Sequence, residues 1–273
     1  MDALGPRYIA VCMLPTTAFD ALARDYDAAF TDTLLGRTLR RALWRWLDRA
    51  FSPGSHVLEV NCGTGEDALH LAGRGVRVLA TDASPGMLEV ARAKLGNARL
   101  ASNVEVRELG IEQLDALAHR YGGALDGAFS SFGGLNCVGD LAAAASSLAA
   151  LLRPDARVVL CVMGRMVPWE WAWFLGRGQP GNALRRFTPG GTQWRGTTVR
   201  YPSIRATRRA FQSQFVVRRV GALGVLLPPP YVNAWAVRHP RVVERLDRWE
   251  RRIEQWPVVP WLGDHYLLEL ERR

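Results

Sequence analysis

Apolar and polar positions along the chain alternate between helical and strand-like patterns. Residues 19–50 carry apolar side chains at helical spacing and end at Ser52-Pro53-Gly54, which predicts one or two amphipathic helices. Short apolar runs then predict strands at 56–60, 76–81, 104–108, 127–131 and 157–163, and the segments between them predict helices at 66–74, 85–95 and 141–152. This alternation is typical of a doubly wound, mostly parallel α/β sheet, which binds ligands at the carboxyl ends of its strands.

The pattern changes after Met163. Residues 167–209 are rich in Trp, Gly, Pro and Arg without a long periodic segment, which indicates an insertion or lid. Regular structure is expected again as a strand at 215–226, a charged helix at 241–256 and a last strand at 265–271. We therefore expect four segments: an N-terminal helical lid (1–52), a core (53–165), an insertion (166–212), and C-terminal strands and helix that complete the sheet (213–273).

The composition fits a chain that folds on its own core. It has 273 residues, 48% of them hydrophobic, and its four cysteines (Cys12, Cys62, Cys137, Cys161) have neither zinc-ligand nor disulfide spacing. The N-terminus lacks the basic region of a signal peptide, and no stretch reaches the roughly 18 apolar residues of a membrane span. We therefore expect a cytoplasmic protein without a metal site.

The net charge of +9 is unevenly distributed. Residues 165–273 hold 19 arginines and eight acidic residues, whereas residues 1–164 carry a net charge of −2. Lys94 is the only lysine, and the arginines occur singly or in pairs, such as Arg185-Arg186 and Arg208-Arg209. A solvated surface and a site for an anion, including RNA, both fit this charge.

The strongest chemical signal is a glycine turn between the strand at 56–60 and the helix that follows. Gly63 and Gly65 let the backbone pass close to a bound nucleoside, where a Cβ would collide with it. Asp82 ends the next strand, 19 residues after Gly63, and its carboxylate is placed to accept two hydrogen bonds from ribose hydroxyls. The turn also fits the fingerprint of nicotinamide enzymes. Glu59 favours a cationic ligand instead, because it would repel a pyrophosphate.

These residues resemble the class I S-adenosylmethionine-dependent methyltransferases over about residues 15–165. Leu58–Gly65 is similar to their first motif, Thr81–Leu88 to their second-strand motif, and Leu125–Asn136 to their fourth-strand segment. The resemblance implies a Rossmann-like, seven-stranded sheet with S-adenosylmethionine as cofactor. Two positions depart from the family: Asn61 replaces its first glycine, and Gly110 stands near its adenine-binding acid. The expected cofactor-binding residues are Glu59, Asn61, Gly63, Gly65, Asp82, Ala83, Met87, Gly110, Ile111, Ser130 and Phe132.

Candidate catalytic residues are fewer. His265 could accept a proton from the acceptor, Tyr26 could close an N-terminal helix over the cofactor, and Glu170 lies in an aromatic setting. For each, a packing or ion-pairing role is the alternative; for Glu170 the alternative partner is an arginine of the insertion. Asn136, Trp169 and Trp173 are expected to line the acceptor pocket.

The expected function is methyl transfer to a small, largely apolar acceptor, with an anionic group on that acceptor as an open possibility. Direct displacement at a sulfonium carbon requires alignment and exclusion of water rather than an elaborate catalytic set. An RNA methyltransferase and a protein that binds S-adenosylmethionine without catalysis are the alternatives. The sequence leaves open whether the acceptor atom is oxygen, nitrogen or carbon, and leaves the oligomeric state open.

Overall fold

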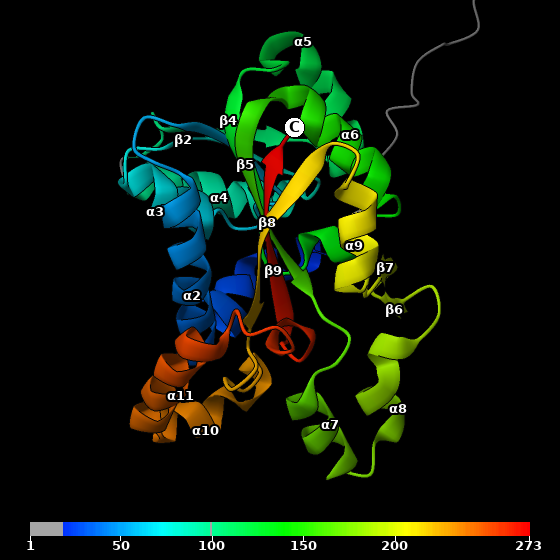
Figure 1. Ribbon diagram of the computed structural model, residues 1–273. Coiled ribbons are helices and arrows are strands. Elements are labelled where there is room, and N and C mark those ends of the chain that lie inside the picture. The colour runs from blue at the N-terminus through cyan, green and yellow to red at the C-terminus, as the bar shows by residue number, and fades with distance from the viewer. Residues whose placement is uncertain (1–18, 99) are drawn as a thin grey trace, which may run out of the picture.

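A computed structural model describes residues 19–98 and 100–273 (Figure 1). Cys12 and the first part of the expected N-terminal lid lie outside the described residues. The centre is a seven-stranded sheet in which the first five strands are parallel and β9 is antiparallel to both of its neighbours. In spatial order the strands are β3 (Val104–Glu108), β2 (Arg77–Asp82), β1 (His56–Val60), β4 (Leu125–Ser130), β5 (Leu152–Met163), β9 (His265–Arg272) and β8 (Phe215–Leu223). Within these residues, none of the helices is long and apolar enough to cross a membrane.

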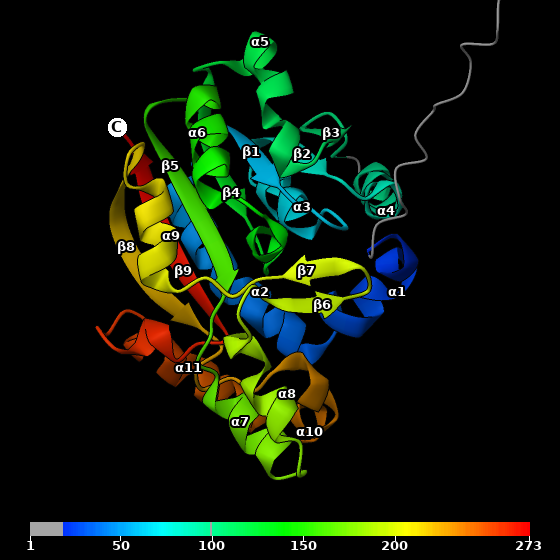
Figure 2. The same ribbon diagram turned by 90° about the vertical axis from the view of Figure 1, so that its right-hand side faces the viewer.

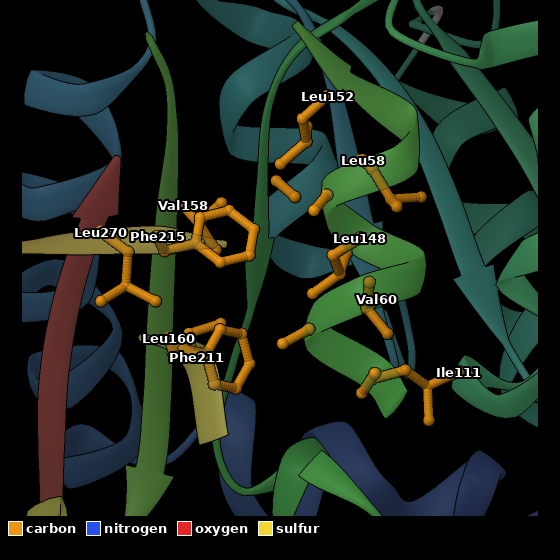
Figure 3. Close-up of a cluster of buried hydrophobic side chains, with 14 of the residues drawn as sticks. Leu58, Val60, Ile111, Leu148, Leu152, Val158, Leu160, Phe211, Phe215 and Leu270 are labelled. Carbon is orange, nitrogen blue, oxygen red and sulfur yellow. The ribbon is translucent and has the colours of Figure 1, made fainter. Parts of the chain in front are cut away.

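Helices cover both faces of the sheet. Along β1 the side chains alternate between the two layers, so that Leu58 and Val60 join one buried cluster and Val57 joins the other. Figure 3 shows the first cluster, in which Leu148 and Phe211 pack against the sheet from α6 (Leu141–Leu151) and α9 (Ile204–Phe211). The second cluster is covered by α2 (Leu34–Ala50), α3 (Glu66–Gly73) and α4 (Pro85–Asn97).

Side-chain caps fix where the main helices begin. The Thr33 hydroxyl accepts from the Gly36 N–H at 2.9 Å at the start of α2, and the Ser84 hydroxyl accepts from the Met87 N–H at 3.2 Å at the start of α4. Asp140 accepts from two N–H groups of α6 in the same way. Because each cap satisfies donors that the first helical turn leaves unpaired, these polar residues define the turns between strands and helices.

The remaining helices lie around this core. At the N-terminal side, α1 (Ala23–Tyr26) leads through a π-helical turn, Asp27–Thr31, into α2. The insertion forms α7 (Pro168–Leu175), α8 (Pro180–Leu184) and a hairpin of β6 (Thr192–Trp194) and β7 (Thr197–Val199), as Figure 2 shows. The others are α5 (Ala118–Tyr121), α10 (Asn233–Arg238) and α11 (Pro240–Ile253).

Several boundaries differ from those expected. The fifth strand begins at Leu152 rather than 157, because Leu152 pairs with Leu125 before an irregularity in the register. The strand expected to reach 226 ends at Leu223, where Gly224 takes a φ of 75°. Residues 167–209 hold short regular elements after all, and α9 packs on the sheet beside α6 through Ile204 and Phe211.

Candidate functional site

The glycine turn after β1 and the turn after β2 meet at the carboxyl end of the sheet. Gly63 and Gly65 take φ values of 53° and 74°, in the left-handed region that glycine tolerates. The Asp82 carboxylate accepts from the Gly63 N–H at 2.8 Å and from the Ser84 N–H at 2.9 Å, and so joins the two turns. Burial raises the pKa of Asp82, while these two bonds act in the opposite direction. The structure thus brings together the two halves of the sequence signal.

The two motif glycines differ in their surroundings. A Cβ on Gly65 would lie 2.9 Å from the Cβ of Ala91, so this glycine permits close packing of the turn against α4. A Cβ on Gly63 would have no neighbour within 4 Å. The open space beside Gly63 is where a ligand can approach the backbone. Asn61 takes a φ of 60° and occupies the space that a side chain on Gly134 would need.

A cluster of buried charges lies beside this turn. Arg40 of α2 pairs with Asp67 of α3, with Nη1 and Oδ2 2.7 Å apart, and both side chains are buried. Among the described residues neither carboxylate oxygen of Glu59 has a hydrogen-bond partner. Burial, followed by the neighbouring Asp67, raises the pKa of Glu59 well above its ordinary value. Arg40 therefore balances the charge of Asp67, and Glu59 is left beside this pair as a buried acid whose ionised form a further cation would favour.

A row of aromatic rings runs from the N-terminal segment to the last strand. Successive ring centroids of Tyr26, Phe30, Phe132 and His265 are 5.9, 5.1 and 5.6 Å apart. The Arg40 guanidinium lies 4.9 Å from the centroid of Phe132, which follows β4 with a φ of 42°. Two candidate catalytic residues therefore stand at opposite ends of one row.

His265 and Tyr26 differ in their polar surroundings. The Nδ1 atom of His265 lies 3.2 Å from the Asp264 carboxylate, and the His265 side chain is buried. Burial raises the pKa of Tyr26, and Arg40, the next largest influence, acts in the opposite direction. Tyr26 therefore keeps a protonated phenol, and the Nδ1 atom of His265 lies beside the Asp264 carboxylate without a hydrogen bond to it.

The remaining expected cofactor residues lie at neighbouring strand ends. Met87 is buried in the first turn of α4, and Ile111 belongs to the core cluster beneath the end of β3. A Cβ on Gly110 would lie 3.6 Å from that of Ala83, which places the ends of β2 and β3 side by side. The Ser130 hydroxyl is buried at the end of β4 and has no hydrogen-bond partner among the described residues. All five positions border the strand ends where such sheets bind ligands.

Glu170 forms part of a buried ion-pair network in the insertion. It pairs with Arg185 at 2.5 Å and with Arg186 at 2.8 Å, which is the arginine pairing left open by the sequence. The Arg186 guanidinium also donates to Asp264 Oδ1 at 2.5 Å and to the carbonyls of Gly164 and Asp264. Arg186 therefore links Glu170 in the insertion to Asp264, the residue before β9.

The three residues expected to line the acceptor pocket make contacts within the protein. The Trp169 indole donates to the Leu226 carbonyl at 3.2 Å, and the Trp173 ring packs against Tyr231 with centroids 5.4 Å apart. Asn136 is fully buried. Its amide accepts from the Met163 N–H at 2.9 Å and donates to the Arg200 carbonyl at 2.6 Å. Asn136 thus holds the segment after β4 against β5 and the hairpin.

A cleft of about 510 Å³ opens at the carboxyl ends of β4 and β5. Leu135 and Val138 line it from the segment after β4. Arg165 lines it from just after β5, and Arg200 and Tyr201 line it from the insertion. Neither arginine side chain has an ion-pair partner among the described residues. The paired arginines noted in the sequence are placed elsewhere: Arg185 and Arg186 bind Glu170, and Arg208 and Arg209 are exposed on α9.

The N-terminal segment and the insertion meet over the strand ends. The rings of Phe19 and Trp194, at the tip of the hairpin, lie 5.3 Å apart. Asp27 accepts a hydrogen bond from the Thr64 hydroxyl in the glycine turn at 2.7 Å and pairs with Lys94 of α4 at 2.7 Å. These contacts bring the N-terminal helices against the turn that holds Gly63.

Comparisons with known proteins identify the central part of this architecture. Residues 57–155 match a family model described as a methyltransferase domain. Demethylmenaquinone methyltransferase of Clavibacter sepedonicus is 34% identical over 146 residues, which cover 52% of this chain and 55% of the relative. A Talaromyces variabilis S-adenosyl-L-methionine-dependent Diels-Alderase is 31% identical over 133 residues, or 47% of this chain and 42% of the relative. The chain thus spans about half the length of these curated relatives.

Two solved structures share the fold at low sequence identity. Geranyl diphosphate C-methyltransferase from Streptomyces coelicolor, crystallised with S-adenosyl-L-homocysteine, has a TM-score of 0.55 and 15% identity, and the match covers 86% of this chain and 79% of that one. The [4+2]-cyclase SpnF has a TM-score of 0.53 and 14% identity, with 93% and 80% of the two chains covered. The seven-stranded α/β sheet expected from the sequence is confirmed.

Proposed function

Because residues 57–155 form a domain of the class I S-adenosylmethionine-dependent methyltransferases, we propose that this chain transfers a methyl group to a small, largely apolar acceptor. The expected family and cofactor are confirmed by the methyltransferase-domain match together with solved structures of this fold that hold S-adenosyl-L-homocysteine or S-adenosylmethionine. The acceptor is the part that we propose. Two observations support the proposal: the bond between the glycine turn and Asp82, and a cleft at the neighbouring strand ends that is lined by other residues.

The residues present fit S-adenosylmethionine. Each carboxylate oxygen of Asp82 accepts one backbone N–H, from Gly63 or from Ser84, and keeps a lone pair for a ribose hydroxyl. The backbone at Gly63 borders open space, and Glu59 is a buried acid that would ionise beside a bound cation. Met87 would pack against the adenine. When bound, the cofactor supplies an electrophilic methyl group on a positively charged sulfur.

The chain's own residues would orient the acceptor and receive its proton. With the Nδ1 of His265 facing Asp264, its Nε2 is the nitrogen available to take a proton from an acceptor hydroxyl or amine. Phe132 and Phe30 would exclude water around the reacting atoms, because they form the centre of the aromatic row. Tyr26, at the other end of that row, would close the N-terminal helices over the cofactor.

The cleft at the ends of β4 and β5 supports a small acceptor. Its volume of about 510 Å³ falls within the roughly 300–1,000 Å³ that is typical of sites for small molecules. Leu135 and Val138 offer apolar surface, and Arg165 and Arg200 offer charge for an anionic group. The names of the relatives and neighbours, which include demethylmenaquinone and geranyl diphosphate, fit an acceptor of this chemistry.

A second candidate function is binding of S-adenosylmethionine without methyl transfer. It is favoured by the similarity to a Diels-Alderase and to a [4+2]-cyclase. An RNA methyltransferase remains the other alternative; the charge of the later half supports it, and it requires RNA binding that weakens steeply with salt.

The test is transfer of isotopically labelled methyl from S-adenosylmethionine to a panel of quinols, prenyl diphosphates and a mixed RNA. We expect a quinol or prenyl diphosphate to accept label, and Arg200→Ala to raise KM for an anionic acceptor about tenfold, as one lost charge-assisted bond implies. Arg208→Ala removes an exposed arginine from α9 and should have no effect. Label in RNA alone, or tight cofactor binding without transfer to any acceptor, would contradict the proposal.

A further inference from the structure

Large apolar side chains are exposed mainly at one end of the molecule. With the exception of Trp194, every exposed large apolar residue recorded in the described part of the chain belongs to two segments, 166–187 and 231–258. Figures 1 and 2 show that α7, α8, α10 and α11 of these segments form the end of the molecule opposite α5. We call this surface the apolar end; its residues are Met166, Trp169, Leu175, Leu184, Phe187, Tyr231, Trp235, Val237, Val242, Trp249, Trp256 and Val258.

The two segments contact each other through Tyr231. The Tyr231 ring, just before α10, lies 5.4 Å from that of Trp173 and 5.9 Å from that of Phe174 on α7. Several members are more than half exposed, among them Trp249 at 56%, Trp256 at 61% and Val258 at 66%. Soluble proteins rarely leave so many large apolar side chains together in water unless the surface binds something.

The charge of this end is strongly positive. Between residues 231 and 258 the exposed charged residues are one glutamate, Glu244, and six arginines: Arg238, Arg241, Arg245, Arg248, Arg251 and Arg252. The other acids of α11 are turned inward. Glu250 is buried and accepts from the four N–H groups of residues 224–227, and Asp247 is buried beside Arg45 and Arg251.

We infer that the apolar end binds the surface of an anionic phospholipid bilayer. Indole rings such as Trp249 and Trp256 prefer the boundary between headgroups and acyl chains, because one part of the ring is apolar and the N–H is polar. Arginines beside them reach the phosphates while their stems cover apolar surface. The helices would lie along the membrane surface, since none of the described helices can span it.

Two other partners fit the same surface less well. RNA would use the arginines and the tryptophans, but the exposed Val237, Val242 and Val258 offer no ring on which a base could stack. A second copy of the chain in a twofold dimer would place the same arginine-rich patch against itself, and the like charges would repel. A bilayer with anionic headgroups satisfies both the aliphatic and the cationic side chains. This inference is independent of the proposed acceptor.

The test is co-sedimentation of the full chain with vesicles of phosphatidylcholine, alone or mixed with phosphatidylserine. We expect binding to the mixed vesicles, weakened by salt, with a blue shift of tryptophan fluorescence. Arg248→Ser and Arg252→Ser should each weaken binding about fivefold, and Trp249→Ser with Trp256→Ser should remove most of it. Circular dichroism confirms that each variant is folded.

The matched controls change the same residue types elsewhere. Trp194→Ser alters an exposed tryptophan of the hairpin, and Arg208→Ser alters an exposed arginine of α9. Neither should change vesicle binding. Equal binding to both vesicle types, or no binding, would overturn the inference. So would RNA binding without vesicle binding, or a dimer in sedimentation analysis that the Trp249→Ser and Trp256→Ser variant abolishes.

Discussion

Arg186 is the residue whose removal should destabilise the protein most clearly. Its side chain is 5% exposed, and its guanidinium pairs with Glu170 and Asp264 and donates to the carbonyls of Gly164 and Asp264. These groups come from the insertion, from the end of β5 and from the start of β9. Arg186→Met keeps much of the stem and removes every polar contact, so that two buried carboxylates lose a partner.

The expected loss of stability follows from those two carboxylates. Removing one member of a buried ion-pair network costs about 3–5 kcal/mol, because an uncompensated charge stays buried. For a chain of this size each kcal/mol lowers Tm by about 2–4 °C, so that the variant should melt about 6–20 °C below the wild type. Arg208→Met, on the exposed face of α9, should change stability by less than about 0.5 kcal/mol.

The pH dependence gives a second signature. In the wild type, burial alone would raise the pKa of Asp264, but Arg186 and then His265 outweigh it and hold the pKa well below its usual range. Asp264 therefore contributes stability above its unfolded pKa that is lost as the pH falls through the folded pKa. Without Arg186 the effect of burial on the Asp264 pKa is opposed by His265 alone, so protonation of Asp264 costs the folded state less than in the wild type. The difference in unfolding free energy between the wild type and Arg186→Met should therefore shrink as the pH falls from neutral to about pH 4.

Urea unfolding of both variants across this pH range measures these quantities. The reasoning would be refuted if Arg186→Met lost less than about 1 kcal/mol of unfolding free energy, or if its difference from the wild type grew as the pH falls.

Two further predictions concern the glycine turn. Burial and the neighbouring Asp67 raise the pKa of Glu59 in the free protein, so Glu59 should release a proton when the S-adenosylmethionine cation binds. The affinity for S-adenosylmethionine should therefore rise with pH, by at most about tenfold per pH unit. Calorimetry in buffers of different ionisation enthalpy should detect this proton in the wild type, and Glu59→Gln should abolish it. Gly65→Ala should lower the free energy of unfolding by about 1–3 kcal/mol, because Gly65 has a positive φ and its new Cβ would press against Ala91. As the control, a Cβ on Gly96 meets no neighbour within 4 Å, so Gly96→Ala should leave the stability unchanged or raise it. Equal melting temperatures for these two alanine variants would count against the packing argument.

The parts of the fold that local pattern determines could be predicted from the sequence. The bounds of β1 and β3 agree with those expected, because each apolar run is closed by turn residues. The sequence could predict that Gly63 and Asp82 lie close together, because each follows or ends a strand at the carboxyl edge of a parallel sheet. The direct bond from the Gly63 N–H to the Asp82 carboxylate was not, because it depends on how the two turns pack.

The contacts that depend on tertiary structure were missed. Arg40 looks like one surface arginine of an amphipathic helix, and only the packing of α2 on α3 shows it buried against Asp67. Helices α7 and α8 have eight and five residues, which is too short for a helical repeat of apolar positions to be recognised in the sequence. The ion pair between Arg186 and Glu170 holds this segment in place. The sequence could name Glu170 as unusual but could not choose between a ligand and an arginine as its partner.

The most direct measurement is calorimetric titration with S-adenosylhomocysteine, with NADH and NADPH as controls. Asp82→Ala removes the proposed ribose contact together with the acceptor of the Gly63 N–H. Asp126→Ala is the matched control: Asp126 accepts from the His56 N–H at 2.7 Å at the opposite end of the sheet. We predict binding of S-adenosylhomocysteine by the wild type and Asp126→Ala, and a loss of about 1.5–3 kcal/mol, or roughly ten- to a hundredfold, in Asp82→Ala. Equal affinity in the two variants, or preference for a nicotinamide, would contradict the assignment of this site.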